Sequence, residues 1–177
     1  MRRIIGIDPG SQRTGYGIID VDRNSAVYVT SGIIRLPKQA LPARLALIFD
    51  AVSQLLEEYS PVEFAVEEVF LARDPRAALK LGQARGAAIV AAVKAGLPVA
   101  EYAARSIKKA VVGSGGADKA QVQMMVTQRL ALHGTPSEDA ADALAIALCH
   151  WQTSATQRLL TSADSVAPSQ FARGRNR

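Results

Sequence analysis

The chain has 177 residues, of which 49% are hydrophobic and 21% are charged, as is typical of one globular domain with an ordinary core. No run of about 18 apolar residues predicts a transmembrane helix, and the apolar stretch after Met1 is too short for a signal peptide. The single cysteine, Cys149, has no partner for an internal disulfide, so a reducing cytoplasm is expected. The net charge of +5 favours a polyanionic partner such as nucleic acid, although this signal is weak by itself.

The order of the predicted elements indicates an α/β fold. Short β-rich runs predict strands at 3–8, 14–20, 26–35, 62–70 and 97–102. Apolar residues at three- and four-residue spacing, together with capping signals, predict helices at 41–59, 75–95, 105–112, 118–130 and 137–151. We therefore expect a mixed five-stranded sheet, with three antiparallel strands followed by parallel crossovers, flanked by helices. This is the order of the ribonuclease H-like fold, an analogy that names no function by itself.

Two segments depart from a regular pattern. The predicted helix 75–95 contains Gly82 and Gly86, each of which costs about 1 kcal/mol relative to Ala, so close packing against the sheet or another helix is expected in compensation. The last segment is rich in Ser, Thr, Ala and Gln and ends in three arginines within five residues. It predicts a flexible basic tail at 153–177, after a folded domain at 1–152. Such a tail either aids solubility or contacts nucleic acid.

Acidic residues occur where a charge needs an explanation. Asp8 ends one apolar strand, and Glu67 or Glu68 ends another. Side chains alternate along a strand, so only one of these two glutamates can join Asp8, and the residues alone leave both open. Asp139 and Asp142, three positions apart, project from one face of the last predicted helix. If that face turns toward the strand ends, four carboxylates converge where α/β folds place their ligands.

Carboxylates so close together would repel one another unless a cation joined them. Mg²⁺ or Mn²⁺ suits ligation by carboxylates alone. Two such ions about 3.5–4 Å apart can clamp a phosphodiester, one activating the attacking water and the other stabilising the leaving oxygen. Each acid alone has an ordinary structural explanation; Asp139, for example, would favour the N-terminus of a helix. The hypothesis of a metal site therefore depends on the acids taken together.

Several motifs follow one another along the chain. They are GIDPG (6–10) with TGYG (14–17), FAVEEVF (64–70), ALKLGQARG (78–86), EYAAR (101–105) and DAADALA (139–145). In sequence and in order they resemble the RuvC family of Holliday-junction resolvases, and the resemblance spans Met1 to about Trp151.

The resemblance implies a ribonuclease H-like nuclease domain, a homodimer, and Mg²⁺-dependent resolution of Holliday junctions in homologous recombination and DNA repair. Two opposed strands would be nicked symmetrically, leaving 5′-phosphate and 3′-hydroxyl ends. Two Mg²⁺ per subunit are implied, with Mn²⁺ as a substitute, together with coupling to a RuvA–RuvB branch-migration complex. The resemblance selects Glu67 over Glu68, because Glu67 matches the family's catalytic glutamate. Asp8, Asp139 and Asp142 match its three aspartates, and some relatives carry His at the position of Asp139, which makes it the most substitutable ligand.

Contacts with DNA are also implied. Lys108 and Lys119 match basic residues near the scissile phosphate, and Phe70 matches an aromatic residue that wedges against bases at the junction. From the residues themselves, Lys119 could neutralise phosphate charge or simply be solvated, and Phe70 could stack on a base or belong to the core. Further phosphate contacts are expected from basic residues on or before the helix 75–95, namely Arg73, Arg76, Lys80 and Arg85.

Two other functions fit part of the pattern. GIDPGSQRTGYG also looks like the first phosphate loop of ATP-binding proteins of the actin, sugar-kinase and Hsp70 type. Those proteins enclose the nucleotide between two such domains, for which 177 residues do not suffice. A non-catalytic DNA-binding module would need the basic residues but no converging acids.

Overall fold

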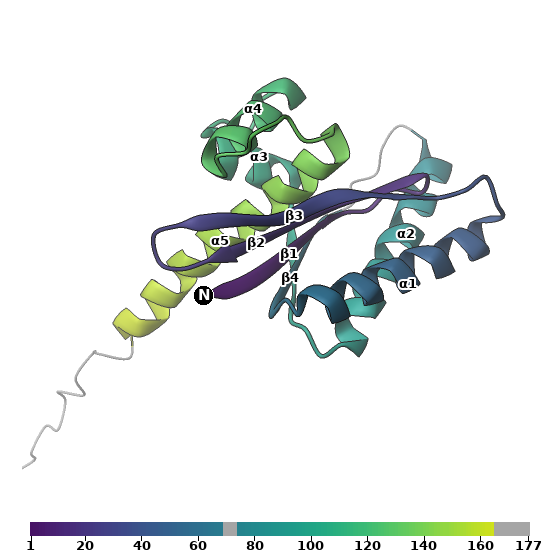
Figure 1. Ribbon diagram of the computed structural model, residues 1–177, viewed down its shortest axis with the longest axis horizontal. Coiled ribbons are helices and arrows are strands. Elements are labelled where there is room, and N and C mark those ends of the chain that lie inside the picture. Colours follow the sequence, from purple (N-terminus) through teal and green to yellow (C-terminus); the bar gives the residue numbers. More distant parts are fainter. Residues whose placement is uncertain (69–73, 165–177) are drawn as a thin grey trace, which may run out of the picture.

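The computed structural model describes residues 1–68 and 74–164. The strands in this part of the chain are β1 (Arg2–Asp8), β2 (Arg13–Val21), β3 (Ala26–Arg35), β4 (Glu63–Glu67) and β5 (Val99–Tyr102). The helices are α1 (Leu41–Tyr59), α2 (Pro75–Lys94), α3 (Ala104–Val112), α4 (Lys119–Arg129) and α5 (Glu138–Asp164). Every predicted element is present in the predicted order (Figure 1).

The strands form one mixed sheet in the order β3-β2-β1-β4-β5. β1, β2 and β3 are antiparallel neighbours, whereas β4 and β5 run parallel to β1. β1 is the central strand and is covered on both faces, which explains its apolar run of Ile4, Ile5 and Ile7, all with no exposed surface. The prediction of three antiparallel strands followed by parallel crossovers is confirmed.

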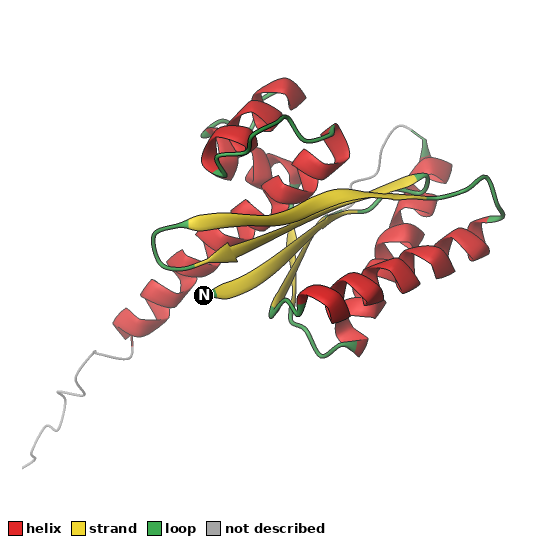
Figure 2. Ribbon diagram, viewed as in Figure 1, coloured by secondary structure: helices red, strands yellow, loops and turns green. Residues whose placement is uncertain are grey.

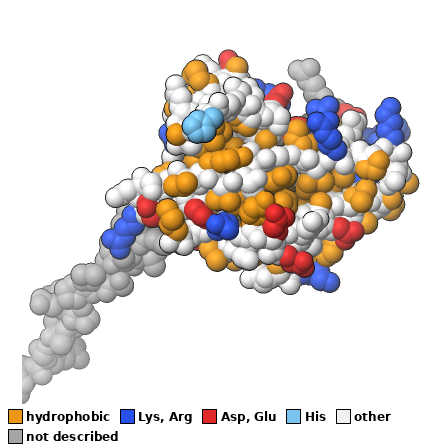
Figure 3. Space-filling view, viewed as in Figure 1, with side chains coloured by type: hydrophobic (Ala, Val, Ile, Leu, Met, Phe, Trp, Pro, Cys, Tyr) orange, Lys and Arg blue, Asp and Glu red, His pale blue; other side chains and the backbone are white. Residues whose placement is uncertain are grey.

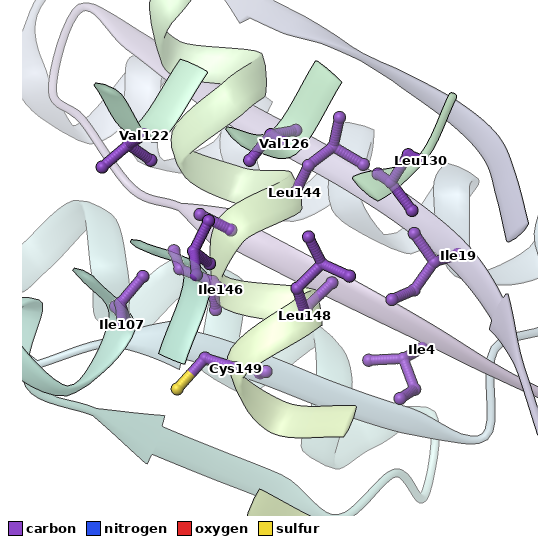
Figure 4. Close-up of a cluster of buried hydrophobic side chains, with 14 of the residues drawn as sticks. Ile4, Ile19, Ile107, Val122, Val126, Leu130, Leu144, Ile146, Leu148 and Cys149 are labelled. Atoms are coloured by element: carbon purple, nitrogen blue, oxygen red, sulfur yellow. The ribbon is translucent and has the colours of Figure 1, made fainter. Parts of the chain in front are cut away.

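Helices cover both faces of this sheet (Figure 2). Side chains alternate along β1, so that Ile5 and Ile7 pack with α1 and α2, whereas Ile4 packs with α3, α4 and α5. The second of these clusters is centred on α5, where Leu144, Ile146 and Leu148 are fully buried or nearly so (Figure 4). The buried stripe of α5 fixes its position across β1 and β2 and thereby places its N-terminal end.

A buried polar chain also holds α5 to the sheet. His150 is 8% exposed, and its Nδ1 lies 2.8 Å from the Tyr102 hydroxyl. Its Nε2 lies 2.7 Å from a carboxylate oxygen of Glu63, which also pairs with Arg2. Burial alone would raise the pKa of Glu63, but the bonds from Arg2 and His150 outweigh it and hold that pKa below its usual value. The chain joins α5 to β1, β4 and β5.

The last helix is longer than its sequence predicted. The expected end was near Trp151, but α5 continues to Asp164, so this boundary was wrong. Hydroxyl groups bond back along the helix, from Ser154 to the Trp151 carbonyl at 3.2 Å and from Thr156 to the Gln152 carbonyl at 3.1 Å. Residues 165–177 of the expected tail lie outside the described residues, and the domain boundary at 152 stays a prediction. Within the described ranges, no helix is both long and apolar enough to cross a membrane.

Candidate active site

Two acidic residues end neighbouring parallel strands. Asp8 is the last residue of β1 and Glu67 the last of β4, and Ile7 pairs with Val66 in register between these strands. Ile7 and Val66 both pack under α1 and α2, so alternation turns Asp8 and Glu67 to the opposite face, under α5. The same alternation turns Glu68 away. The structure therefore brings Glu67, and not Glu68, to the face that carries Asp8.

Three glycines allow α5 to lie directly on the backbone of the sheet. A Cβ atom built at Gly15 would lie 2.0 Å from the carbonyl oxygen of Asp139, and one at Gly6 would lie 2.2 Å from that of Ala143. Gly17, the cross-strand partner of Gly6, meets Leu144 in the same way. No side chain larger than hydrogen fits between the helix and the strands at these positions. We call Gly6, Gly15 and Gly17 the glycine strip.

The glycine strip sets the position of the first turn of α5. Gly15 is the cross-strand partner of Asp8, so the backbone of Asp139 lies against the strand pair that carries Asp8. Asp142 follows one turn later, and its charge acts on both Asp8 and Glu67. The four acids named from the sequence therefore converge at one end of the sheet. The strands at 3–8 and 14–20 were predicted, but the contact of their glycines with the last helix was not, because no local pattern shows which helix crosses them.

Burial and mutual repulsion change the titration of these acids. Burial first, and then the charges of Asp142, Glu67 and Asp139, raise the pKa of Asp8 from 3.8 to about 7. Burial and Asp142 also raise the pKa of Glu67. The pKa of Asp142 is raised by burial, which Lys119 opposes, and by Glu138 and Asp139. The cluster therefore holds more negative charge than its protein surroundings compensate.

Two lysines border the acids. Lys119 is the first residue of α4, a helix that the Asp118 carboxylate caps by accepting a bond from the Gln121 backbone N–H at 2.8 Å. Its Nζ pairs with Glu138, and this bond, with the nearby Asp142 and Asp8, raises the pKa of Lys119. The charges of Lys119 and of Lys108 in α3 both oppose the rise in the pKa of Glu67. The two lysines named from the sequence thus lie beside the acid cluster.

The acids do not form a ready-made coordination shell. Within residues 1–68 and 74–164, no three Asp, Glu, His or Cys side chains are arranged as a group that could hold a metal ion. The cluster is electrostatic in this structure: its members act on one another's charge, and their carboxylate oxygens are the donors that hard cations prefer.

The other residues predicted to contact DNA are differently placed. Arg76 and Lys80 are exposed at the beginning of α2. Arg85 turns inward: its Nε donates to the Glu67 carbonyl at 2.9 Å, and its guanidinium pairs with Glu101. Arg85 therefore holds the end of β4 in place, and the DNA contact predicted for it is not tested. Phe70 and Arg73 lie outside the described residues.

One basic residue beside the acids was not predicted. Arg13 begins β2, and its guanidinium lies 3.9 Å from the Asp139 carboxylate. The only signal in the sequence was the position of this cation between the motifs GIDPG and TGYG, and it was missed because the glycines of both motifs drew the interpretation.

Comparison with known proteins agrees with this geometry. A family model described as crossover junction endodeoxyribonuclease RuvC matches residues 4–150. The RuvC protein of Pseudoalteromonas atlantica is 60% identical over 153 residues, covering 86% of this chain and 88% of the relative. That of Shewanella loihica is 57% identical over 150 residues, covering 85% and 87%. A solved structure of T. thermophilus RuvC in complex with Holliday junction substrate is 35% identical, with a TM-score of 0.83, and the match covers 89% of this chain and 97% of that one. The predicted resemblance and the ribonuclease H-like fold class are confirmed.

Proposed function

Because this chain belongs to the RuvC family of crossover junction endodeoxyribonucleases, we propose that it resolves Holliday junctions during homologous recombination and DNA repair. It would nick two opposed strands of a four-way DNA junction symmetrically, leaving 5′-phosphate and 3′-hydroxyl ends. The observation that carries this proposal is the acid cluster at the end of the sheet, bordered by Lys108 and Lys119. Phosphodiester hydrolysis uses both kinds of group: acids to hold cations, and cations to neutralise the phosphate.

In this proposal Asp8, Glu67, Asp139 and Asp142 hold two Mg²⁺ ions per subunit, for which Mn²⁺ can substitute. The donor set supports this, since carboxylate oxygens suit hard cations. The raised pKa of Asp8 supports it as well, because a bound cation would compensate the charge that now favours its protonation. When bound, Mg²⁺ supplies an activated water and stabilises negative charge on the phosphate. The strand ends and the first turn of α5 would keep the four carboxylates in place.

Basic residues would act on the phosphate itself. Lys119, held near the cluster by Glu138, would neutralise charge that develops on the phosphate in the transition state, and Lys108 would assist it. Exposed Arg76 and Lys80 would hold phosphates of the junction arms. Further DNA contacts are proposed for Arg85, and for Arg73 and Phe70 on the strength of the resemblance, with Phe70 as the wedge against junction bases.

A homodimer would supply the two active sites that paired nicks require, related by a twofold axis. The outer face of α2 supports this. Leu79, Val90 and Val93 are 68%, 51% and 60% exposed, and Gly82 and Gly86 have open space at their Cβ positions among the described residues. The five residues follow one another at steps of three or four and so form one stripe, which we call the α2 stripe. The glycines do not pack on the sheet, and we propose that a second copy of α2 packs on them instead.

Three further proposals rest mainly on the resemblance. The enzyme would work in the cytoplasm, where the free and buried Cys149 stays reduced. It would act with a RuvA–RuvB branch-migration complex. Residues 1–152 would form the nuclease domain, and 153–177 would form a basic extension, although α5 continues into that extension as far as Asp164.

The test is cleavage of a synthetic four-way junction, with each strand labelled in turn, with and without Mg²⁺. We expect paired nicks at symmetric positions in opposed strands only when Mg²⁺ is present, and a DNA ligase should reseal them. Asp8→Asn should abolish nicking and leave junction binding largely intact, whereas Asp50→Asn, the same change on the exposed side of α1, should cut normally. Normal cutting by Asp8→Asn would remove Asp8 from the metal site. Failure of the wild-type chain to cut would overturn the proposed function.

A further inference from the structure

A second group of charged residues lies outside the acid cluster. A pocket of about 550 Å³ opens where β2 begins, β3 ends and α1 begins. Four of the residues that line it are basic: Arg13, Arg35, Lys38 and Arg44. Among the described residues, no acidic side chain lines it. Figure 3 shows Lys and Arg side chains standing at this end of the molecule, where β3 leads into α1. We call these four residues the basic pocket.

The strand register places two cations of the basic pocket directly opposite each other, an arrangement that a bound anion would stabilise. Arg13 and Arg35 are direct cross-strand partners on β2 and β3, and like charges directly opposite each other destabilise a sheet. The 3.9 Å contact from Arg13 to Asp139 compensates little, because the Arg13 side chain is 64% exposed and solvent screens the pair. An anion between the two strand ends would turn this repulsion into attraction.

Arg44 adds a buried donor to the same pocket. Its guanidinium bonds to the carbonyl of Ser11, in the loop after Asp8, and its Nε is buried without a hydrogen-bond partner in the described part of the chain. A buried donor without a partner is unfavourable, and the Arg44 guanidinium, which lines the pocket, adds its charge to those of the other three cations. The first turn of α1 contains no acidic residue, and Ala40 provides no side-chain cap, so the positive end of the helix dipole also remains available.

The basic pocket is built onto the candidate active site. Arg44 ties α1 to the loop that follows Asp8, and Thr14 holds that loop by bonds to both the N–H and the carbonyl of Gly10. Arg13 reaches the Asp139 carboxylate. A DNA strand whose scissile phosphate lies at the acids would therefore carry its neighbouring phosphates toward the pocket. The acids themselves repel phosphates, so cations just beyond them would hold the strand in register.

We propose that the basic pocket binds backbone phosphates of the junction arm that is being cut, next to the scissile phosphate. The inference rests on the proposed function and adds to it a phosphate site on β2, β3 and α1. It is independent of base sequence, since its cations contact the backbone, and it should therefore act on four-way junctions and plain duplex alike.

The test compares Arg35→Glu with Arg23→Glu. Both arginines are exposed and belong to the same hairpin, but Arg35 lies at the pocket and Arg23 in the turn at the opposite end. Binding of a labelled four-way junction is measured in EDTA over a series of salt concentrations. We expect Arg35→Glu to weaken binding about tenfold near 0.1 M salt and to reduce the slope of log K against log salt by about one. Arg23→Glu should change affinity less than about twofold, and Arg35→Lys should retain most of it.

Equal weakening by Arg35→Glu and Arg23→Glu would show that only net charge matters, and would overturn the pocket. Unchanged binding by Arg35→Glu would do the same. Both outcomes differ from failure of the proposed function, in which the wild-type chain would not cut the junction in Mg²⁺. Thermal unfolding of both variants checks that neither substitution disturbs the fold.

Discussion

A carboxylate at the end of a buried strand is costly to ionise, and Asp8 illustrates why. Burial removes the water that would stabilise its charge, and three acids nearby add repulsion, so its pKa rises to about 7. Near neutral pH the metal-free protein therefore holds Asp8 partly protonated. A cation at the cluster would compete with that proton, which makes metal binding dependent on pH.

The titration of Asp8 predicts how stability depends on pH in the metal-free protein. Its folded pKa, about 7, lies above its ordinary value of 3.8, so its favourable contribution is complete below pH 4 and is lost as the pH rises through 7. Asp8→Asn removes this loss. In EDTA at pH 8 we expect the variant to be the more stable protein, by a few kcal/mol at most, since one pKa unit corresponds to about 1.4 kcal/mol. Urea unfolding at pH 5 and pH 8 measures the difference.

The difference should shrink toward pH 5, and added Mg²⁺ should stabilise the wild-type protein at pH 8 but not Asp8→Asn. Asp50→Asn, an exposed change on α1, is the control and should follow the wild-type profile. Parallel profiles of stability against pH for wild type and Asp8→Asn would mean that folding does not raise the pKa of Asp8.

At the scale of single residues, the sequence predicted which residues form the site better than it predicted what their side chains contact. Position at a strand end and spacing on a helix were enough to name the acids. The residues alone left Glu67 and Glu68 open, and the resemblance selected Glu67; the physical reason is the pairing of Ile7 with Val66, which no local pattern encodes. The DNA contact expected of Arg85 stays a prediction, whereas its bond to the Glu67 carbonyl depends on long-range packing and could not be predicted from local pattern.

At the scale of elements, the glycine strip determines how the acids of α5 reach those of the strands. A Cβ atom at Gly6 would lie 2.2 Å from the Ala143 carbonyl oxygen and 2.8 Å from the Ala147 nitrogen, both of them backbone atoms that a rotamer change cannot move. Only a shift of α5 away from β1 could relieve such a clash. That shift would carry Asp139 and Asp142 away from Asp8.

Gly6→Ala should therefore impair both stability and cleavage. We expect a loss of about 3 kcal/mol in the free energy of unfolding, as for overpacking of a tight core, and a large fall in junction cleavage. Urea unfolding and cleavage at saturating Mg²⁺ measure the two effects. Gly134→Ala is the matched control, because its Cβ would meet nothing within 4 Å among the described residues, and it should stay within about 0.5 kcal/mol of wild type. Normal cleavage by Gly6→Ala would show that the close approach of α5 is not needed.

Element types and most boundaries followed from local pattern, because periodicity and capping act within a few residues. Asp118, for example, caps α4 as its position suggested. The end of α5 did not follow. The segment after Trp151 is polar, but it has no Gly or Pro before Pro168 to stop a helix, and the hydroxyls of Ser154 and Thr156 find partners one turn back. Polarity was mistaken there for lack of structure.

At the scale of the whole molecule, the mixed sheet with its antiparallel and parallel strands followed from the sequence of elements, whereas the crossing of α5 over β1 and β2 did not. That crossing depends on which strands lack side chains on one face, and it decides whether the acids meet. The resemblance to a nuclease family and the structure both bring the acids of α5 together with those of β1 and β4. The phosphate-loop interpretation of GIDPGSQRTGYG loses its basis, because Gly6, Gly15 and Gly17 are occupied by contacts with α5.

The α2 stripe makes the homodimer testable. Val93 is 60% exposed, so Val93→Glu should leave each subunit folded. In a twofold interface centred on α2, the substitution places a charge on an apolar contact in both copies, and repulsion and desolvation add. We expect the dimer dissociation constant to rise at least about a hundredfold, which corresponds to roughly 2.7 kcal/mol. Analytical ultracentrifugation measures the change, and nicks in the two opposed strands should become uncoupled.

Met124→Glu is the matched control for this experiment. Met124 is 53% exposed on α4, on the other side of the sheet from α2, so the same kind of change there should leave the dimer intact. If Val93→Glu remains dimeric, the subunits associate through another surface. A monomeric wild-type chain that still makes paired nicks would contradict the homodimer itself, because one set of four acids would then have to serve both opposed strands in turn.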